Sequence, residues 1–326
     1  MWPAYMPATR GINMVNNFAE LEQKLKNSTT KSVLALCCSQ DKHSLEAVAK
    51  ARRGGLIEAV LIGDVAKTKE ILAKIGESAS DYKFVEQDGA ENVVATAASM
   101  VNEGTVNLIM KGKIQTSDLM RNVLKKENNL RKSSVISVCG LLELEKYPNG
   151  SKRRFIVNTD PAINVHPSLA QKKAILENAV GLMHALGNEC PKVACIAANE
   201  QVSPKILETV EANELKEMYL RGEITGCVVD GPLSLDLAMS PESASIKGMN
   251  SPVAGAADIL MMPDLVSSNV FAKFATVLSN CLDAGVVLGA KIPMVLTSRA
   301  AEASNKYYSI ALAAYVAKYG NREDIR

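Results

Sequence analysis

The chain has 326 residues, of which 47% are hydrophobic and 22% are charged, and its formal net charge is +2. These values are ordinary for a folded protein of one large or two medium domains, and they argue against a basic nucleic-acid groove or an acidic tail. Aromatic residues make up only 4%, too few for surfaces that stack single-stranded nucleic acid. No apolar run approaches the roughly 20 residues that span a bilayer, so we expect neither nucleic acid nor a membrane as partner.

The first half of the chain alternates apolar runs with helical periodicity. Residues 1–13 contain two prolines and are expected to be disordered. Strands are then predicted over 32–38, 57–62, 84–85 and 106–110, and helices over 44–53, 65–75, 91–101 and 117–125. Because these strands are apolar along their whole length, the sequence predicts an α/β fold whose parallel sheet has helices on both faces.

The second half begins with a change of pattern. Strands over 133–142 and 154–157 are joined through a hairpin-type turn at 147–150, so we expect an antiparallel pair there. A long helix then begins at the capping-box pair Ser168 and Gln171. The remaining predictions are strands over 193–197, 226–229, 258–262, 286–288 and 294–296, and helices over 168–186, 205–212, 268–282 and 304–318.

The cysteines and histidines form none of the usual ligand patterns. The seven cysteines include no CxxC pair, and the three histidines share no ligand spacing, so no metal site is expected. Free thiols of this kind suit a reducing cytosol, and we expect a cytoplasmic protein. The sequence also lacks the GxGxxG, GxxxxGK[ST] and GxSxG motifs, which argues against dinucleotide, P-loop and serine-hydrolase sites.

The first of five polar segments follows the strand over 106–110. It contains Lys111, Gly112 and Thr116, and Arg121 lies within the next predicted helix. Glycine lets a bulky anion approach the backbone, and a helix N-terminus with lysine and threonine nearby can bind phosphate. The alternative is a plain β–α turn with solvated lysines.

The last polar segment ends the strand over 294–296 with Thr297, Ser298 and Arg299. A hydroxyl and a guanidinium are thereby placed together just before a helix. This arrangement suits a phosphoryl group, because the planar fork of arginine matches phosphate oxygens. The alternative for Arg299 is an ion pair with a nearby carboxylate.

Three further polar segments also follow predicted strands. Their candidate residues are Asp160 and Asn164, then Gly231 and Asp236, and then Asn269. Each can contact a substrate, and each has an ordinary alternative as a turn or capping residue. Because open α/β sheets bind ligands beyond the carboxyl ends of their strands, the five segments together predict a site there.

Together these segments resemble the phosphate acetyl/butyryltransferase family, from about residue 32 to about residue 319. The resemblance implies a two-domain fold with parallel and mixed sheets, related to isocitrate and isopropylmalate dehydrogenases, with the active site in the interdomain cleft. We expect domain I to comprise residues 1–140 plus 288–326 and domain II to comprise 141–287. The Lys-Gly pair at 111–112 and the Leu-Thr-Ser-Arg segment at 296–299 look more like the butyryl branch.

The resemblance also implies a reaction, in which acyl-CoA and inorganic phosphate give acyl phosphate and CoA by direct attack, without an acyl-enzyme or a metal. CoA is then a substrate, no cofactor is permanently bound, and the partners are small molecules and further copies of the chain in a homo-oligomer. The expected catalytic residues are Ser298, Arg299, Asn305 and Asp236. The expected substrate- and phosphate-binding residues are Lys111, Gly112, Thr116, Arg121, Asp160, Asn164, Gly231 and Asn269.

One position departs from the family pattern. In the acetyl branch an aspartate seven residues after the motif serine is the proposed base for the CoA thiol, and the matching residue here is Asn305. Glu302 and Asp236 are possible substitutes. The alternatives to a phosphate butyryltransferase are therefore a phosphate acetyltransferase and a non-catalytic protein that binds CoA or acyl phosphate.

Overall fold

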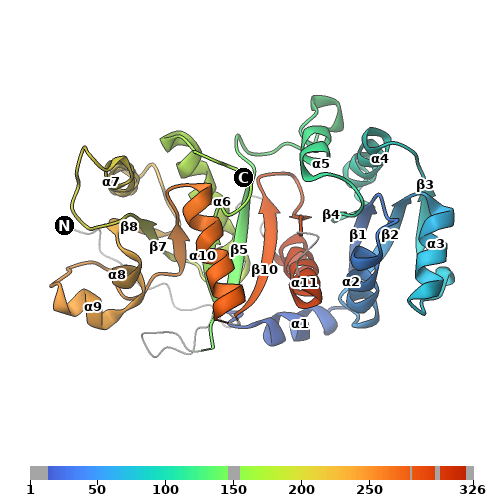
Figure 1. The fold of residues 1–326 in the computed structure, drawn as a ribbon, viewed down its shortest axis with the longest axis horizontal. Coiled ribbons are helices and arrows are strands. Elements are labelled where there is room, and N and C mark those ends of the chain that lie inside the picture. The colour runs from blue at the N-terminus through green and yellow to red at the C-terminus, as the bar shows by residue number, and fades with distance from the viewer. Residues whose placement is uncertain (1–13, 146–154, 280, 298–301, 321–326) are drawn as a thin grey trace. The chain divides into compact units, whose positions relative to one another are not determined.

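The computed structural model describes residues 14–145, 155–279, 281–297 and 302–320 (Figure 1). The chain divides into two compact units. Unit 1 comprises Met1–Asn17, Ser134–Leu282 and Gly320–Arg326, and unit 2 comprises Phe18–Ser133 and Asp283–Tyr319. The expected disorder of residues 1–13 and the expected turn at 147–150 lie outside the described residues.

Unit 2 alternates strands and helices, as the periodicity predicts. Its main elements are α1 (Phe18–Lys26), β1 (Ser32–Cys37), α2 (Lys42–Arg53), β2 (Ile57–Gly63), α3 (Val65–Lys74), β3 (Lys83–Glu86), α4 (Ala90–Asn102), β4 (Leu108–Lys111), α5 (Thr116–Val123), β10 (Leu282–Leu288), β11 (Met294–Val295) and α11 (Ala303–Tyr319). The first residue of β10 belongs to unit 1.

The strands of unit 2 pair in the order β3-β2-β1-β4-β11-β10. All these pairs are parallel except β10 with β11. The chain moves from β1 through β2 to β3 and then returns past β1 to β4. Because such crossovers are right-handed, α2 and α3 cover one face of the sheet and α4 covers the other. α11 packs against α2, and α5 packs against α4, so both faces are covered (Figure 1).

Unit 1 holds the remaining elements. They are β5 (Ser137–Glu143), β6 (Phe155–Thr159), α6 (Leu169–Ala185), β7 (Lys192–Ile196), α7 (Leu207–Leu220), β8 (Val228–Leu233), α8 (Leu235–Met239), α9 (Pro241–Ile246), β9 (Ile259–Met261) and α10 (Leu265–Leu278). The strands pair in the order β5-β6-β9-β7-β8. β5 and β6 form the predicted antiparallel pair, and the other pairs are parallel, so the sheet is mixed.

Two strand and helix boundaries in unit 1 differ from the prediction. β8 was expected to end at residue 229, but it continues to Leu233 through Gly231 and Pro232. Proline is tolerated because β8 is the last strand in the order, where one row of backbone groups has no neighbouring strand to pair with. α7 extends past the predicted end at 212 because Leu215 is buried and continues its packed face.

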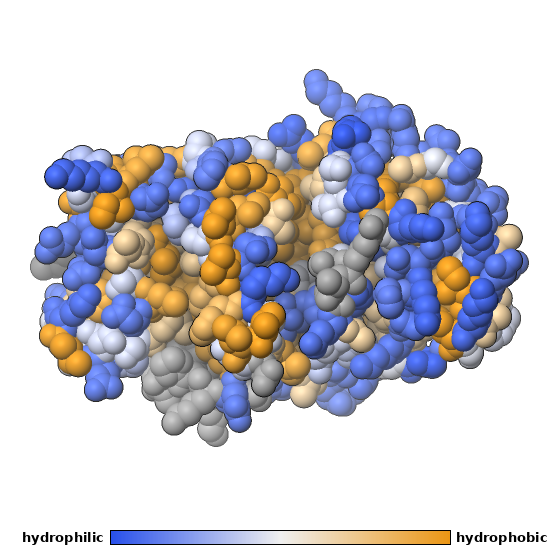
Figure 2. Space-filling view, viewed as in Figure 1, coloured by the Kyte–Doolittle hydropathy of each residue, from blue (hydrophilic) through white to orange (hydrophobic). Residues whose placement is uncertain are grey.

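The helix predicted over 268–282 is α10, and it lies three residues earlier than expected. Asp264 caps it by accepting a hydrogen bond from the backbone N–H of Ser267 at 2.8 Å. Several of its apolar side chains are exposed, and Figure 2 shows apolar surface over this helix. These residues are Val266, Val270, Phe274, Val277 and Leu278, with exposed fractions of 56 to 72%.

None of the helices in the described residues is both long and apolar enough to cross a membrane.

Candidate active site

A cleft of about 810 Å³ lies at the carboxyl ends of β1, β2, β3 and β4 in unit 2. Residues at or just after the end of each strand line it, among them Cys38, Asp64, Glu86 and Lys113. β1 and β4 are neighbours in the sheet, although the chain leaves β1 toward β2. The cleft therefore lies at a topological switch point, where open α/β sheets commonly bind ligands.

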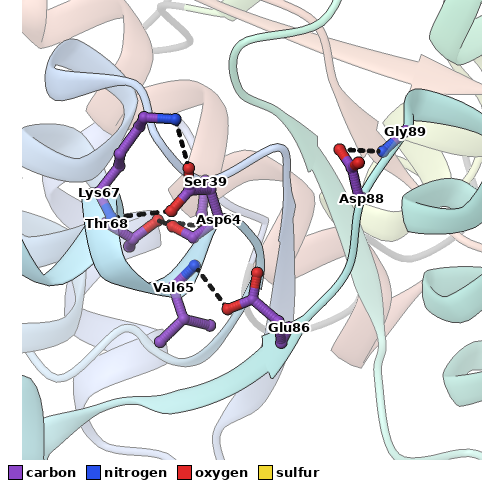
Figure 3. A network of polar contacts seen from close by, with 8 residues as sticks. All are labelled: Ser39, Asp64, Val65, Lys67, Thr68, Glu86, Asp88 and Gly89. Atoms are coloured by element: carbon purple, nitrogen blue, oxygen red, sulfur yellow. Dashed lines mark hydrogen bonds and ion pairs between the residues drawn. The ribbon is translucent and has the colours of Figure 1, made fainter.

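One wall of the cleft, after β2 and β3, is anionic (Figure 3). Asp64 caps α3 by accepting from the backbone N–H of Lys67 at 2.9 Å and from its Nζ at 2.6 Å. Glu86 accepts from the backbone N–H of Val65 at 3.1 Å, and Asp88 accepts from the next N–H along the chain at 2.8 Å. The hydrogen bond from Lys67 lowers the pKa of Asp64. This wall suits hydroxyl or amine donors better than phosphate.

The opposite wall is the first polar segment, and Gly112 determines its position. Its backbone N–H donates to the Cys37 carbonyl at 2.9 Å, and that of Lys113 donates to the Cys38 carbonyl at 2.8 Å. A Cβ atom at Gly112 would collide with the Cys38 carbonyl oxygen and lie 2.7 Å from that of Cys37. Only glycine therefore allows the end of β4 to approach the end of β1 this closely.

The other candidates of this segment differ in exposure. Lys111 is buried, and its Nζ donates to the Ile114 carbonyl at 3.3 Å. Thr116 is exposed at the start of α5, where the N-cap residue makes no side-chain capping bond. Arg121 is 71% exposed and pairs with Asp118 at 3.1 Å. A surface pair of this kind is worth about 0–1 kcal/mol, so Arg121 can exchange Asp118 for a phosphate at little cost.

In unit 1, Asp160 organises the loop after β6. Its carboxylate accepts backbone N–H bonds from Val138, Ala162, Ile163 and Asn164 at 3.0–3.2 Å. It also accepts from the side-chain amide of Asn164. Burial raises the pKa of Asp160, and these hydrogen bonds oppose that rise. The contacts are those of a turn residue, the ordinary alternative for Asp160, because its oxygens already have five donors.

Two further predicted residues contact the same loop, one from within it and one from α10. Asn164 also donates to the Ile136 carbonyl at 2.9 Å. Asn269, in the second turn of α10, donates to the Pro161 carbonyl at 3.0 Å. The structure therefore brings Asp160, Asn164 and Asn269 together around one loop of unit 1.

Gly231 and Asp236 have different surroundings within unit 1. Gly231 is buried in β8, and a Cβ atom there would lie 2.6 Å from the Cβ of Cys195, so glycine allows β8 to pack closely on β7. Asp236 is exposed in the first turn of α8 and accepts from Ser234 Oγ at 2.5 Å. This hydrogen bond lowers the pKa of Asp236 and makes it a weaker base.

The last segment is described only in part. Ser298 and Arg299 lie outside the described residues. Asn305 is half-buried in the first turn of α11, and its Nδ2 donates to Asp283 Oδ2 at 2.6 Å. Asp283 lies at the start of β10 and is absent from the residues predicted from the sequence. It belongs to none of the five polar segments, and only the tertiary contact connects it with them.

Four of the buried cysteines are poor nucleophiles. Burial raises the pKa of the Cys37, Cys38 and Cys195 thiols, and it raises that of Cys139 to about 12. These thiols are therefore protonated at neutral pH, whereas the thiolate is the reactive form. The described part of the chain also contains no group of three or more His, Cys, Asp or Glu residues that could hold a metal ion.

Comparison with protein families and known sequences gives a consistent result. Residues 85–314 match the model of the family described as phosphate acetyl/butaryl transferase. The chain is 40% identical over 309 residues to a phosphate butyryltransferase of Clostridium acetobutylicum, covering 95% of this chain and 100% of that protein. It is 37% identical over 284 residues to a phosphate acetyltransferase of Thermotoga maritima, covering 87% and 95%.

Solved structures agree with these relatives. A branched-chain phosphotransacylase from Enterococcus faecalis V583 matches with a TM-score of 0.78 and 28% identity, covering 88% of this chain and 99% of that one. The α/β fold with a mixed sheet is thus the fold of known phosphotransacylase structures.

Proposed function

The chain belongs to the phosphate acetyl/butyryltransferase family, and from this premise we propose that it transfers a short acyl group between CoA and inorganic phosphate, with butyryl-CoA preferred to acetyl-CoA. The observation that carries the proposal is the similarity to the Clostridium acetobutylicum phosphate butyryltransferase, which extends over the whole of that protein. The expected resemblance to this family is confirmed.

The preference for butyryl over acetyl is the finer part of the proposal. A second phosphate butyryltransferase, from Clostridium beijerinckii, is 38% identical over 304 residues. The 37% identity to a phosphate acetyltransferase keeps acetyl-CoA as the competing substrate. One added methylene in an apolar pocket changes discrimination by only about 1–3 kcal/mol, so the two activities have to be compared directly.

The proposed mechanism is direct attack without an acyl-enzyme. Thiolate and phosphate exchange at the acyl carbon, so the protein has to position two anionic substrates and stabilise the oxyanion that forms between them. The high pKa values of the buried cysteines support this proposal, because none of those thiols is a ready acyl acceptor.

We assign the residue roles as follows. Arg121 and Arg299 neutralise the phosphate, and Ser298 with Thr116 orients it and donates to the developing oxyanion. Lys111 and Gly112 shape the loop that presents Thr116, a role that their contacts with Ile114 and Cys37 support. Asp160, Asn164 and Asn269 hold a loop of unit 1 that contacts the CoA substrate.

The proposal extends to the domain organisation. Units 1 and 2 correspond to the two domains of an isocitrate and isopropylmalate dehydrogenase-like fold, with the C-terminal segment returning to the N-terminal domain. The location of the active site between two domains stays a prediction. So do the homo-oligomeric state and the cytoplasmic location.

The decisive experiment is release of CoA thiol from butyryl-CoA, measured with a thiol reagent in the presence of EDTA. The expected result is release that requires phosphate, proceeds without added metal and is faster with butyryl-CoA than with acetyl-CoA. Faster release from acetyl-CoA would favour a phosphate acetyltransferase. A folded sample that binds CoA but releases none from either substrate would instead indicate a non-catalytic binding protein.

A further inference from the structure

Asp283 and Asn305 form a hydrogen-bonded pair between the start of β10 and the first turn of α11. The Asn305 Nδ2 donates to Asp283 Oδ2 at 2.6 Å, and both side chains are half-buried. We propose that Asp283 accepts the proton of the CoA thiol and that Asn305 holds its carboxylate in position. This inference rests on the proposed function, because it assigns a base to that reaction.

The sheet register places Asp283 at the edge where the first polar segment begins. β11 is parallel to β4, with Val295 level with Met110. β10 is antiparallel to β11, with Val287 level with Met294. The first residues of β10 therefore extend beyond the carboxyl ends of β11 and β4. Asp283 lies at the same edge of the sheet as Lys111, which ends β4, and Gly112, which follows it.

A second contact orients the pair. One turn after Asn305, Ser309 Oγ accepts from the backbone N–H of Gly285 at 2.9 Å. β10 and α11 thus run side by side in the same direction from Asp283 and Asn305 onward. The Asp283 carboxylate lies beside the first turn of a 17-residue helix, and these two contacts fix its position there.

The chemistry requires such an acceptor. A thiol with a pKa of about 8.5 is only a few per cent ionised at neutral pH. In the direction that forms thioester, the S–H proton passes to Asp283, the sulfur forms a bond to the acyl carbon, and the bond from that carbon to the phosphate oxygen breaks. Phosphate leaves with the electron pair, and Asp283 later returns its proton to solvent. In the reverse direction the protonated Asp283 donates to the departing thiolate.

Other candidates are less suited to this role. The Asn305 amide cannot take a proton. Glu302 is exposed just before α11, and Asp236 is exposed in the first turn of α8. Compared with these two carboxylates, Asp283 is half-buried and is also held by a neighbouring side chain.

The test compares the wild-type enzyme with Asp283→Asn, which keeps the shape of the side chain and removes the base. The expected loss of kcat at pH 7, with acyl phosphate and CoA as substrates, is about 100-fold, with KM values within about twofold, at the lower end of what general-base removal costs. The loss should shrink as the pH approaches 9, since solvent then ionises the thiol. Asp81→Asn, at an exposed ion pair with Arg52, is the matched control and should keep full activity.

Titration of other groups does not disturb this comparison. Glu302 precedes α11 and Lys306 follows Asn305 on it, and burial lowers the pKa of Lys306 while Asp41 and Glu46 oppose that shift. These groups are the same in both enzymes, so their effects largely cancel in the ratio of the two rates.

The double variant Asp283→Asn with Asn305→Asp supplies the rescue test. It exchanges the two side chains and keeps one carboxylate in the pair. The kcat of the double variant at pH 7 should therefore be at least tenfold higher than that of Asp283→Asn. A folded Asp283→Asn enzyme with near-normal kcat at pH 7 would overturn the inference. A loss that is equal at all pH values and is not rescued would also overturn it, since that is the pattern of a structural role. A wild-type enzyme without turnover on any acyl-CoA would overturn the proposed function itself.

Discussion

At the scale of single residues, the close packing of the backbone at the carboxyl edge of unit 2 depends on a glycine, which has no side chain, and on two buried cysteines. Gly112 lets β4 end against the carbonyls of Cys37 and Cys38, and Cys38 itself has a φ of 55°. Non-glycine residues rarely adopt such a φ, and positions of this kind occur often at functional sites. The lining of the cleft is therefore set by close backbone packing as much as by its charged side chains.

Replacing Gly112 with alanine should lower stability. The added Cβ collides with backbone carbonyls that have no room to move, so we expect a loss of about 1–3 kcal/mol in the free energy of unfolding. The shift in denaturant midpoint measures it. Gly140→Ala is the matched control, because its nearest neighbour, the Asn158 carbonyl oxygen, lies at 3.4 Å. Equal midpoints for the two variants would contradict the packing argument.

Replacing Arg299 with alanine should remove most activity and leave the fold intact. One charge-assisted contact to phosphate in a transition state is worth about 3 kcal/mol, so kcat/KM should fall at least a hundredfold. Arg221→Ala provides the control, since that guanidinium pairs on the surface with Glu214 and Glu223. A folded Arg299→Ala enzyme with near-normal turnover would show that the proposed phosphate role is wrong.

At the scale of elements, helix ends were predictable where the signal is local. Ser168 and Gln171 form the predicted capping box, and both of its hydrogen bonds are present. α10 was misplaced because its cap, Asp264, directly follows an apolar strand and a proline, while later serines offered an equally plausible start. The position at which the preceding strand ends determines which residue caps the helix. Periodicity alone locates that strand end only to within a few residues.

Ser168→Ala tests the capping box of α6. It removes the acceptor for the Gln171 N–H and should cost about 1 kcal/mol of stability, measured by thermal or denaturant unfolding. Ser78→Ala is a suitable comparison, because Ser78 precedes a single 3-10 turn and makes no capping bond there. If both variants unfold alike, the capping box does not contribute as proposed.

At the scale of the whole molecule, the exposed apolar stripe of α10 bears on assembly. Val266, Val270 and Phe274 follow one another at four-residue spacing, so they share one side of the helix. Lys273 is the single charged residue of α10, so two copies of this stripe can face each other across a twofold axis without strong repulsion. Contiguous exposed apolar surface of this kind commonly marks an interaction site. We expect a second copy of the chain to cover it.

Phe274→Lys should weaken that association. A lysine at the centre of a self-facing stripe brings two like charges together and removes apolar contact, so the oligomer should dissociate at concentrations where the wild type is assembled. Light scattering after size-exclusion chromatography measures the mass. Val202→Lys, at an exposed valine outside α10, should leave the mass unchanged. A wild-type chain that is monomeric throughout would rule out this interface.

The sequence by itself determined the α/β class, the alternation of unit 2, the antiparallel pair of β5 and β6 and the family. These follow from signals carried by neighbouring residues: apolar runs, helical periodicity, a hairpin turn and short motifs at strand ends. The family carried most of the functional conclusion, because its motifs are themselves local.

The tertiary structure decided the features that depend on which distant segments meet. β8 continues through Pro232 because it is the last strand of its sheet. Asp160 has five donors because a loop folds around it, and Asp283 meets Asn305 across 22 positions because β10 reverses direction beside β11. Register and strand order create these contacts, and neither is encoded in any single stretch of the sequence.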